Sequence, residues 1–322
     1  MRYVLDLVGR RILQAIPVML GVSLIVFSLL SLLPGSAALA ILGPGATNAQ
    51  VAHLSQQLGL NQPFVERYLI WVGHAITGNL GTSLLTNQPV IAEIEQRLPV
   101  SFEIMVISYI LSLGTAIPVA ILAARRPRGI ADSINRLFST VALSVPGFVT
   151  ALLLILVFSV KLGLLPTEGF VPLAHGLVPN VKSLILPSAS VSVGLFANYS
   201  RILRSDMIDQ LRNEDYVLTA RAKGIGQWRI LFLHVAKNSL FPLITVVGTN
   251  FGYLIGGVVV VENVFGLPGM GQLMQYSILN RDYTVVQGEV ILIAVAVILM
   301  NLVTDLAYIF LDPRVRYGAT GN

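Results

Sequence analysis

The sequence predicts an all-α integral membrane protein with six transmembrane helices. Of its 322 residues, 55% are hydrophobic and 11% are charged, and the mean hydropathy is +0.78. Soluble proteins carry roughly 25% charged residues. Apolar runs of bilayer length, roughly 20 residues, recur along the chain. No soluble domain of ordinary size is left between them, so residues 1–322 are expected to form a single transmembrane domain.

Six apolar segments are long enough to cross the bilayer. The first follows Arg10 and Arg11 and exceeds the roughly 7 to 15 apolar residues of a secretory signal, so it is expected to be a retained span. Six spans place both termini on the same side. The segments are residues 11–33, 101–124, 134–160, 185–203, 240–262 and 286–311.

The basic residues indicate which side faces the cytoplasm. Sixteen Lys and Arg residues fall in the termini and loops on one side of the predicted spans, and five fall on the other side. Because cytoplasmic loops are enriched in Lys and Arg, both termini and the polar segment at residues 204–239 are expected in the cytoplasm. These loops explain the pI of 9.6, so no nucleic-acid partner is expected.

Two segments are expected to face the opposite side. Residues 34–98 mix short amphipathic stretches with turn formers, and they predict a small, partly helical extracytoplasmic cap. Residues 262–283 contain the run Phe265–Gly271, in which Gly and Pro break a straight helix. Such a segment is expected to re-enter the membrane or to lie along its interface, because broken backbone at membrane depth needs protein or water beside it.

The polar segment at residues 204–239 is predicted to contain two short helices. Good helix formers run from Asp215 to Gly224, and Gly224-Ile225-Gly226 is expected to end the first helix. A second helix is expected over residues 227–239, before Phe241-Pro242 introduces the fifth span. Two helices joined by a glycine hinge would project from the membrane face as a knob.

This knob has the character of a docking surface. Ala220 and Ala222 are expected on its surface, where small side chains allow close contact with a groove of a partner. A third of all basic residues lie in or beside it: Arg201, Arg204, Arg212, Arg221, Lys223, Arg229 and Lys237.

Small residues recur in the fifth predicted span. Gly248, Gly252 and Gly256 are four residues apart and form a flat stripe that another helix can approach closely. The stripe indicates either packing within the chain, or a subunit interface or wall of a conduit.

Polar residues in or beside the fifth span are candidates for lining a path through the membrane. They are Asn250, Tyr253 and Asn263, and packing roles are the alternative for each.

Four carboxylates lie in or near the spans, where an ionised group is costly and therefore a functional candidate. Glu103, Glu262 and Glu289 are expected near span ends within reach of water, in structural roles. Asp305 lies about two turns inside the cytoplasmic boundary. It is expected to pair with a cytoplasmic-side Arg, with proton relay as the alternative.

Several chemistries have no sequence signal. Cysteine is absent, and the four histidines are widely separated, so neither catalytic residues nor a metal site is expected. No G-x-x-x-x-G-K-[ST] motif occurs, so nucleotide binding by that phosphate cradle is not expected either.

The run Asp-Tyr-Val-Leu-Thr-Ala-Arg-Ala-Lys-Gly, residues 215–224, resembles the cytoplasmic loop of permease subunits of ATP-binding-cassette (ABC) importers. The whole chain is similar to the first permease of the dipeptide/oligopeptide/nickel family. Two departures are Leu218, where the family's loop has Glu, and Ser36, where the family has Asp. Further matches span nearly the full length, among them Leu33-Pro34-Gly35, Gly78-Asn79-Leu80-Gly81, Arg97-Leu98-Pro99, Ser144-Val145-Pro146, Pro268-Gly269-Met270-Gly271, Asn280-Arg281-Asp282-Tyr283 and Leu311-Asp312-Pro313-Arg314.

This resemblance implies a type I ABC importer permease in a bacterial inner membrane. It implies a second homologous permease, two ATPase subunits that bind ATP and Mg²⁺, and an extracytoplasmic peptide-binding protein. This chain would itself be no enzyme and would bind no cofactor. The residues implied to contact an ATPase are Asp215, Thr219, Ala220, Arg221, Ala222, Lys223 and Gly224.

Alternatives remain for cargo and for driving force. Di- and oligopeptides are the expected cargo, and similar permeases carry nickel chelates or glutathione. An ion-coupled secondary transporter using Asp305 and Glu289 is the competing class, and it would be expected to contain internal repeats. None is visible in the sequence. A membrane enzyme or a purely structural scaffold has little support, because no nucleophile-base pair or metal cluster is visible.

Overall fold

The computed structural model describes residues 2–32, 37–43, 45–57, 59 and 61–311, and most of these residues are helical. They fall into two compact units. The first contains the residues up to 100 together with 268–302, and the second contains 101–267 together with the residues from 303 onward. Two long helices, α5 (Val90–Arg125) and α13 (Tyr283–Leu311), contribute residues to both units.

The first unit contains an aromatic cluster between α1 (Arg2–Leu32) and α4 (Phe64–Ile76). Phe27 lies 5.3 Å from the ring of Phe64 and 5.5 Å from the ring of Tyr68, and the Tyr68 hydroxyl is 2.9 Å from that of Ser23. Residues 34–98 are partly helical, as predicted, because α2 (Ala37–Leu42), α3 (Asn48–Gln57) and α4 lie within them. Their location outside the cytoplasm stays a prediction. This unit also contains α12 (Met270–Leu279).

Two motifs that are distant in sequence meet in the first unit. The Ser83 hydroxyl donates a hydrogen bond of 2.5 Å to the buried Asp282 carboxylate, which also accepts the Leu84 N–H at 3.2 Å. Gly288 lies so close to Val90 that an added Cβ would be 2.6 Å from the valine Cγ1. The loop before α5 and the turn before α13 are therefore fixed to one another.

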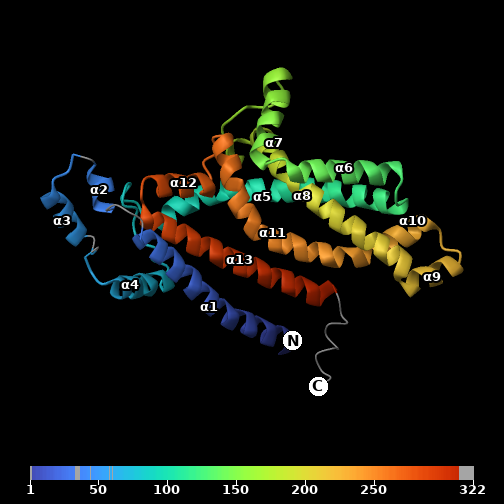
Figure 1. Ribbon diagram of the computed structural model, residues 1–322, viewed down its shortest axis with the longest axis horizontal. Coiled ribbons are helices and arrows are strands. Elements are labelled where there is room, and N and C mark those ends of the chain that lie inside the picture. The colour runs from blue at the N-terminus through green and yellow to red at the C-terminus, as the bar shows by residue number, and fades with distance from the viewer. Residues whose placement is uncertain (1, 33–36, 44, 58, 60, 312–322) are drawn as a thin grey trace. The chain divides into compact units, whose positions relative to one another are not determined.

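The second unit is built around α8 (Leu177–Asn213), which packs against α6, α7 and α11 (Figure 1). The short helices α9 and α10 lie at the end of α8 that is far from α7. The remaining elements are α6 (Ile130–Ser144), α7 (Gly147–Leu154), the π-helix η1 (Ile155–Lys161), the 3₁₀ turn η2 (Leu173–His175), α9 (Asp215–Ala222), α10 (Gln227–Arg229), the π-helix η3 (Ile230–Val235) and α11 (Ala236–Val264).

Long apolar helices coincide with five of the six predicted spans. Among the described residues, five helices are long and apolar enough to cross a membrane, and a sixth span is formed if α6 and α7–η1 are counted together. The span predicted over residues 134–160 is not a straight helix, because these two pieces meet at 105°. Pro146 has no N–H to donate, and its ring forces Val145 into an extended conformation with φ −92° and ψ 124°.

The second helix of the polar segment does not stop at Ser239, contrary to prediction. Helical structure continues from α10 through η3 into α11, so residues 227–264 form one unbroken run. Pro242 lies inside α11. Proline is tolerated in membrane helices because neighbouring groups and local π-helical turns satisfy the freed backbone carbonyl.

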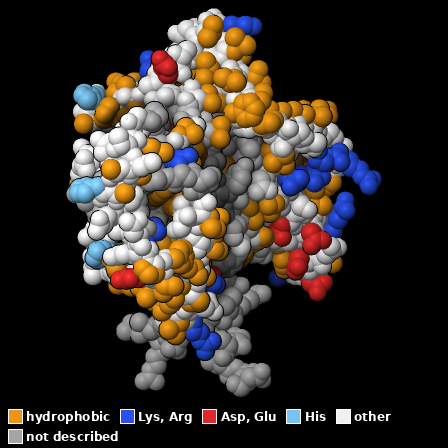
Figure 2. All heavy atoms as spheres, turned by 60° about the vertical axis from the view of Figure 1, so that its left-hand side comes forward, with side chains coloured by type: hydrophobic (Ala, Val, Ile, Leu, Met, Phe, Trp, Pro, Cys, Tyr) orange, Lys and Arg blue, Asp and Glu red, His pale blue; other side chains and the backbone are white. Residues whose placement is uncertain are grey.

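The surface of the second unit is characteristic of a membrane protein. On α6, Ile130, Ile134, Leu137 and Val141 are exposed, whereas the polar Asn135 faces inward. This is the reverse of a water-soluble amphipathic helix, and it fits lipid as the surrounding solvent. Hydrophobic side chains cover broad areas in the space-filling view, and Lys and Arg gather near a group of Asp and Glu (Figure 2).

Candidate functional site

The helix α9 ends in a Schellman turn that favours glycine. The Gly224 N–H donates to the Arg221 carbonyl at 2.9 Å, and the Ile225 N–H donates to the Ala220 carbonyl at 3.1 Å. These are the two hydrogen bonds that define the motif. Gly224 has φ +73°, in the left-handed region that a residue with a Cβ enters at a cost. The predicted helix stop at Gly224 is therefore confirmed.

Most of the residues expected to contact a partner are exposed on α9 and its C-terminal turn. They are Asp215, Thr219, Arg221, Ala222, Lys223 and Gly224. Ala220 was predicted on the surface, and this was wrong: it is 6% exposed and shares an inward face with Val217, three residues earlier. Its small side chain allows α9 to approach the rest of its own chain.

A hydrogen bond joins α9 to α8, and the same side chain of α8 is hydrogen-bonded to α11. The Tyr216 hydroxyl donates to Gln210 Oε1 at 2.5 Å, and Gln210 Nε2 donates to the Ser239 hydroxyl of α11 at 3.0 Å. Burial is the main cause that raises the pKa of the Tyr216 phenol above its ordinary value of 10.0. Tyr216 therefore remains a neutral donor at physiological pH. At the other end of α9, Arg221 Nη2 donates to the Leu211 carbonyl of α8 at 3.3 Å.

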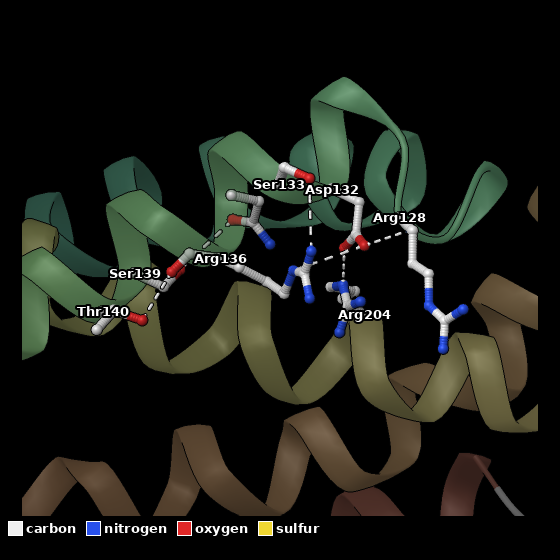
Figure 3. A network of polar contacts seen from close by, with 8 residues as sticks. Arg128, Asp132, Ser133, Arg136, Ser139, Thr140 and Arg204 are labelled. Carbon is white, nitrogen blue, oxygen red and sulfur yellow. Dashed lines mark hydrogen bonds and ion pairs between the residues drawn. The ribbon is translucent and has the colours of Figure 1, made fainter.

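A buried carboxylate joins α6 to α8 in the same region (Figure 3). Asp132 is fully buried and accepts a hydrogen bond from Arg204 Nε of α8. Its other oxygen accepts the Arg128 N–H at 2.7 Å. Arg136, which is 53% exposed, lies 3.7 Å from that second oxygen. A buried charge is tolerated only when it is paired and hydrogen-bonded, and both conditions are met here.

The C-terminal residue of α5, Arg125, contacts the start of α10. The guanidinium carbon of Arg125 lies 4.2 Å above the centre of the Trp228 ring, a cation–π contact. The side-chain amide of Gln227 donates to the Arg125 carbonyl at 3.1 Å. Arg125 thus contacts α10, the helix that follows α9 in the chain. Asp132 of α6 contacts α8, the helix that precedes α9. We call residues 125–136, Arg204, Gln227 and Trp228 the bracket.

Sequence reasoning missed Asp132 and Trp228. An Asp in the first turn of a helix is a common N-terminal feature and drew no attention. Its partner Arg204 lies 72 residues away, so no spacing rule connects them. For Trp228, the exposed aromatic beside a glycine turn was the available signal.

A cavity of about 410 Å³ lies among α6, α7, α8 and α11. Residues on both sides of the break between α6 and α7 line it, and so does Asn250, one of the three predicted lining residues. Asn263 does not line it; this residue is exposed, and its amide donates to the Val259 carbonyl at 2.8 Å. The side chain of Tyr253 lies outside the described residues. The polar residues of the cavity are Thr150, Ser190, Asn198 and Asn250.

The glycine stripe of α11 serves packing within the chain at one of its three positions. An added Cβ on Gly248 would lie 2.0 Å from Thr304 Oγ1 of α13, so only glycine allows this approach. Gly252 is half-buried, and the burial of Gly256 is outside what the structure describes. A subunit contact by the stripe stays a prediction.

Burial overturns part of the prediction for the carboxylates. Glu262 and Glu289 are fully buried, so the expectation that water reaches them was wrong. Glu262 accepts a hydrogen bond of 2.5 Å from the Ser101 hydroxyl, and Glu103 accepts one of 2.8 Å from Asn180. These two carboxylates therefore join α11 and α8 to α5. The pairing predicted for Asp305 remains untested.

Comparisons with known proteins cover both ends of the chain. Residues 116–317 match the family described as binding-protein-dependent transport system inner membrane component, and residues 4–105 match its N-terminal membrane component. A protein named as a probable peptide ABC transporter permease from Sinorhizobium fredii is 40% identical over 96% of this chain and 98% of its own length.

Two further relatives are similar at the same level. The oligopeptide transport system permease protein AppB of Bacillus subtilis is 37% identical over 96% of this chain and 98% of its own. The glutathione transport system permease protein GsiC of Salmonella choleraesuis is 37% identical over 97% of this chain and 99% of its own. The family match over residues 116–317 spans α9, the bracket and the residues that line the cavity.

Proposed function

The chain belongs to the family of binding-protein-dependent transport system inner membrane components, and from that membership we propose that it carries short peptides as one permease of an ATP-driven importer. It is a multi-pass membrane permease, in keeping with its apolar helices. Relatives named for peptides and oligopeptides support peptide cargo. The relative named for glutathione supports a tripeptide within the same range.

The observation that carries the proposal is the geometry of α9. This short helix is joined to α8, which is in turn joined to α11, and it ends in a turn that favours glycine. It exposes Thr219, Ala222 and Lys223. Such a helix suits insertion into a groove of a partner protein. In our proposal the partner is an ATPase subunit, which binds the ATP and Mg²⁺, and this chain performs no chemical step.

The proposed complex contains four further subunits. A second homologous permease completes the conduit, two ATPase subunits dock on the cytoplasmic side, and an extracytoplasmic binding protein delivers the peptide. In this arrangement both termini of the chain lie in the cytoplasm, in agreement with the distribution of Lys and Arg.

The bracket explains how movement of α9 would reach the membrane. Closure of the ATPases displaces α9, and the hydrogen bonds of Gln210 carry that displacement to α8 and α11. Through Asp132 and Arg125 the same displacement reaches α6. Rigid helices that are held together in this way move as a body, and the permease alternates between outward-open and inward-open packings.

Reconstitution tests the proposal. The chain is co-purified with the second permease and the ATPases of the proposed complex, placed in liposomes, and supplied with the binding protein. We expect uptake of labelled di- and tripeptides, glutathione included, that depends on ATP. Uptake by the single chain under a proton gradient, without ATPases, would instead establish an ion-coupled secondary transporter. Uptake of nickel chelates but not of peptides would reassign the cargo.

A further inference from the structure

We propose that the cavity among α6, α7, α8 and α11 is a transit site that binds the backbone amides of the cargo through neutral side chains. The inference rests on the proposed function and specifies what part of a peptide the permease recognises. Three observations support it: the chemistry of the lining residues, the unfilled space beside two glycines, and the position of the cavity at the break between α6 and α7.

The polar lining matches a peptide group. Thr150 contributes a hydroxyl, and Asn198 and Asn250 contribute carboxamides, so each of these three can donate and accept hydrogen bonds. The Ser190 hydroxyl donates to the Pro187 carbonyl at 2.6 Å and offers the cavity an acceptor. A peptide bond presents one N–H donor and one carbonyl acceptor. Hydrogen bonds from these side chains replace those that the peptide group made with water, which lowers the cost of moving it from water to membrane depth.

No residue that lines the cavity carries a charge, and all thirteen of them are described. A charged side chain of the cargo therefore meets neither a counter-ion that would retain it nor a like charge that would repel it. The remaining lining residues are aliphatic or glycine, for example Leu195 and Leu254. Recognition consequently falls on the feature that all peptides share, which suits a permease that receives cargo already selected outside the membrane.

The cavity has unfilled space next to two of its glycines. An added Cβ at Gly147 or Gly194 would meet no atom within 4 Å. Neither glycine has the positive φ that would penalise a side chain. Larger side chains at these positions therefore extend into open space without displacing backbone, and Gly194→Leu reduces the cavity from within α8.

The position of the cavity relates it to the conformational change. It lies where Pro146 separates α6 from α7, and α6 is the helix that the bracket attaches to α8. Movement of α6 relative to α7 changes the width of the cavity. The transit site is thus placed where ATP-driven movement would load and release a peptide.

The test measures ATP-dependent uptake of trialanine by the complete complex in liposomes, with the binding protein saturated. We expect Asn250→Leu to reduce uptake about tenfold, which corresponds to one lost hydrogen bond to a buried polar group. Gly194→Leu is expected to reduce uptake by a similar factor, because its side chain occupies space that the cargo needs. Asn250→Ser retains a donor and acceptor and is expected to recover most of the activity. Two matched controls, Asn301→Leu and Gly114→Leu, change exposed residues that do not line the cavity and are expected to transport as wild type.

Cargo variants complete the test. Trilysine and triglutamate are expected to show the same fold reduction as trialanine in Asn250→Leu, because the proposed site reads no side-chain charge. Wild-type uptake by both Asn250→Leu and Gly194→Leu would overturn the transit site while leaving the proposed function intact. A loss confined to one charge class would overturn amide recognition. A wild-type complex that carries no peptide would overturn the proposed function, and this inference with it. Basal ATPase activity and complex yield show whether each variant has assembled.

Discussion

Two polar regions of the second unit use hydrogen-bonding groups in opposite ways. In the bracket, charged side chains are paired: Asp132 is fully buried and held by Arg204 and a backbone N–H. In the cavity, polar side chains are neutral, and they border about 410 Å³ of space. Paired charges fix helices to one another, whereas neutral groups beside open space leave hydrogen-bonding capacity for a ligand. The difference separates the parts of a permease that transmit force from the part that contacts cargo.

The largest effect is expected from breaking the ion pair of the bracket. Asp132→Asn keeps an acceptor for the Arg128 N–H but leaves Arg204 without its charge partner, and we expect a loss of about 3 kcal/mol in the free energy of unfolding. Thermal unfolding of the purified complex measures it. In a double-mutant cycle, Arg204→Gln in the Asp132→Asn background is expected to cost much less than it does alone.

Arg136→Gln is the matched control for the ion pair. Arg136 lies near the same carboxylate but is 53% exposed, so its removal is expected to cost under about 0.5 kcal/mol. Equal losses for Asp132→Asn and Arg136→Gln would contradict the role assigned to the buried pair.

Glycine substitutions contrast a filled site with an open one. Gly248→Ala places a Cβ against Thr304 and is expected to destabilise the protein by about 1–3 kcal/mol, with Thr304→Ala restoring most of the loss. Gly194→Ala, which extends into the cavity from within α8, is expected to stabilise it by about 0.5–1 kcal/mol. The melting temperatures of the two variants and of the wild type, measured in the same detergent, show whether Gly248→Ala destabilises the protein and Gly194→Ala stabilises it. A stabilised Gly248→Ala variant would show that α11 and α13 are not in close contact.

The turn after α9 gives a test at the partner surface. Gly224→Val imposes about 1–2 kcal/mol of strain, because valine is disfavoured at φ +73°. We expect the complex to assemble but to take up about tenfold less peptide per ATP hydrolysed. Gly226→Val is the control, since Gly226 has an extended conformation with φ −63° and ψ 146° that valine adopts readily. Similar coupling ratios for the two variants would remove the special role of Gly224.

The smallest effect is expected at Trp228. Loss of its cation–π contact with Arg125 in Trp228→Leu is expected to cost about 0.5–1 kcal/mol in stability and to lower the coupling ratio two- to fivefold. Phe232→Leu removes the neighbouring ring, 5.7 Å away, without touching Arg125 and serves as the comparison. If Phe232→Leu has the larger effect, the stacking of the rings is what matters and not the cation.

Local features of this molecule were predictable because they depend on a few neighbouring residues. The apolar runs indicated the long helices, and Gly224 after a run of helix formers indicated the end of α9. Relations between distant segments were not predictable. The inward orientation of Ala220 depends on how α9 lies against its own chain, and the Asp132–Arg204 pair joins residues 72 apart. The break at Pro146 was not predicted, because apolar residues continue on both sides of it.

The candidate site was predicted in the same uneven way. Six of the seven expected contact residues of α9 and its turn are exposed, because a short polar helix has few ways to fold. Of the three expected lining residues, Asn250 borders the cavity and Asn263 does not, because polarity alone does not specify which side of a helix faces open space. The orientation of the chain in the membrane remains a prediction from its basic residues.

Site-specific cross-linking tests the central claim that α9 contacts an ATPase subunit. The chain contains no cysteine, so Thr219→Cys introduces a single attachment point for a photoactivated cross-linker on the exposed face of α9. Val141→Cys, exposed on α6 outside the bracket, is the control. We predict that Thr219→Cys captures the ATPase and that the yield changes when ATP is bound, whereas Val141→Cys captures none. Complexes that hydrolyse ATP and import peptide, yet yield no ATPase adduct from Thr219→Cys, would contradict the account.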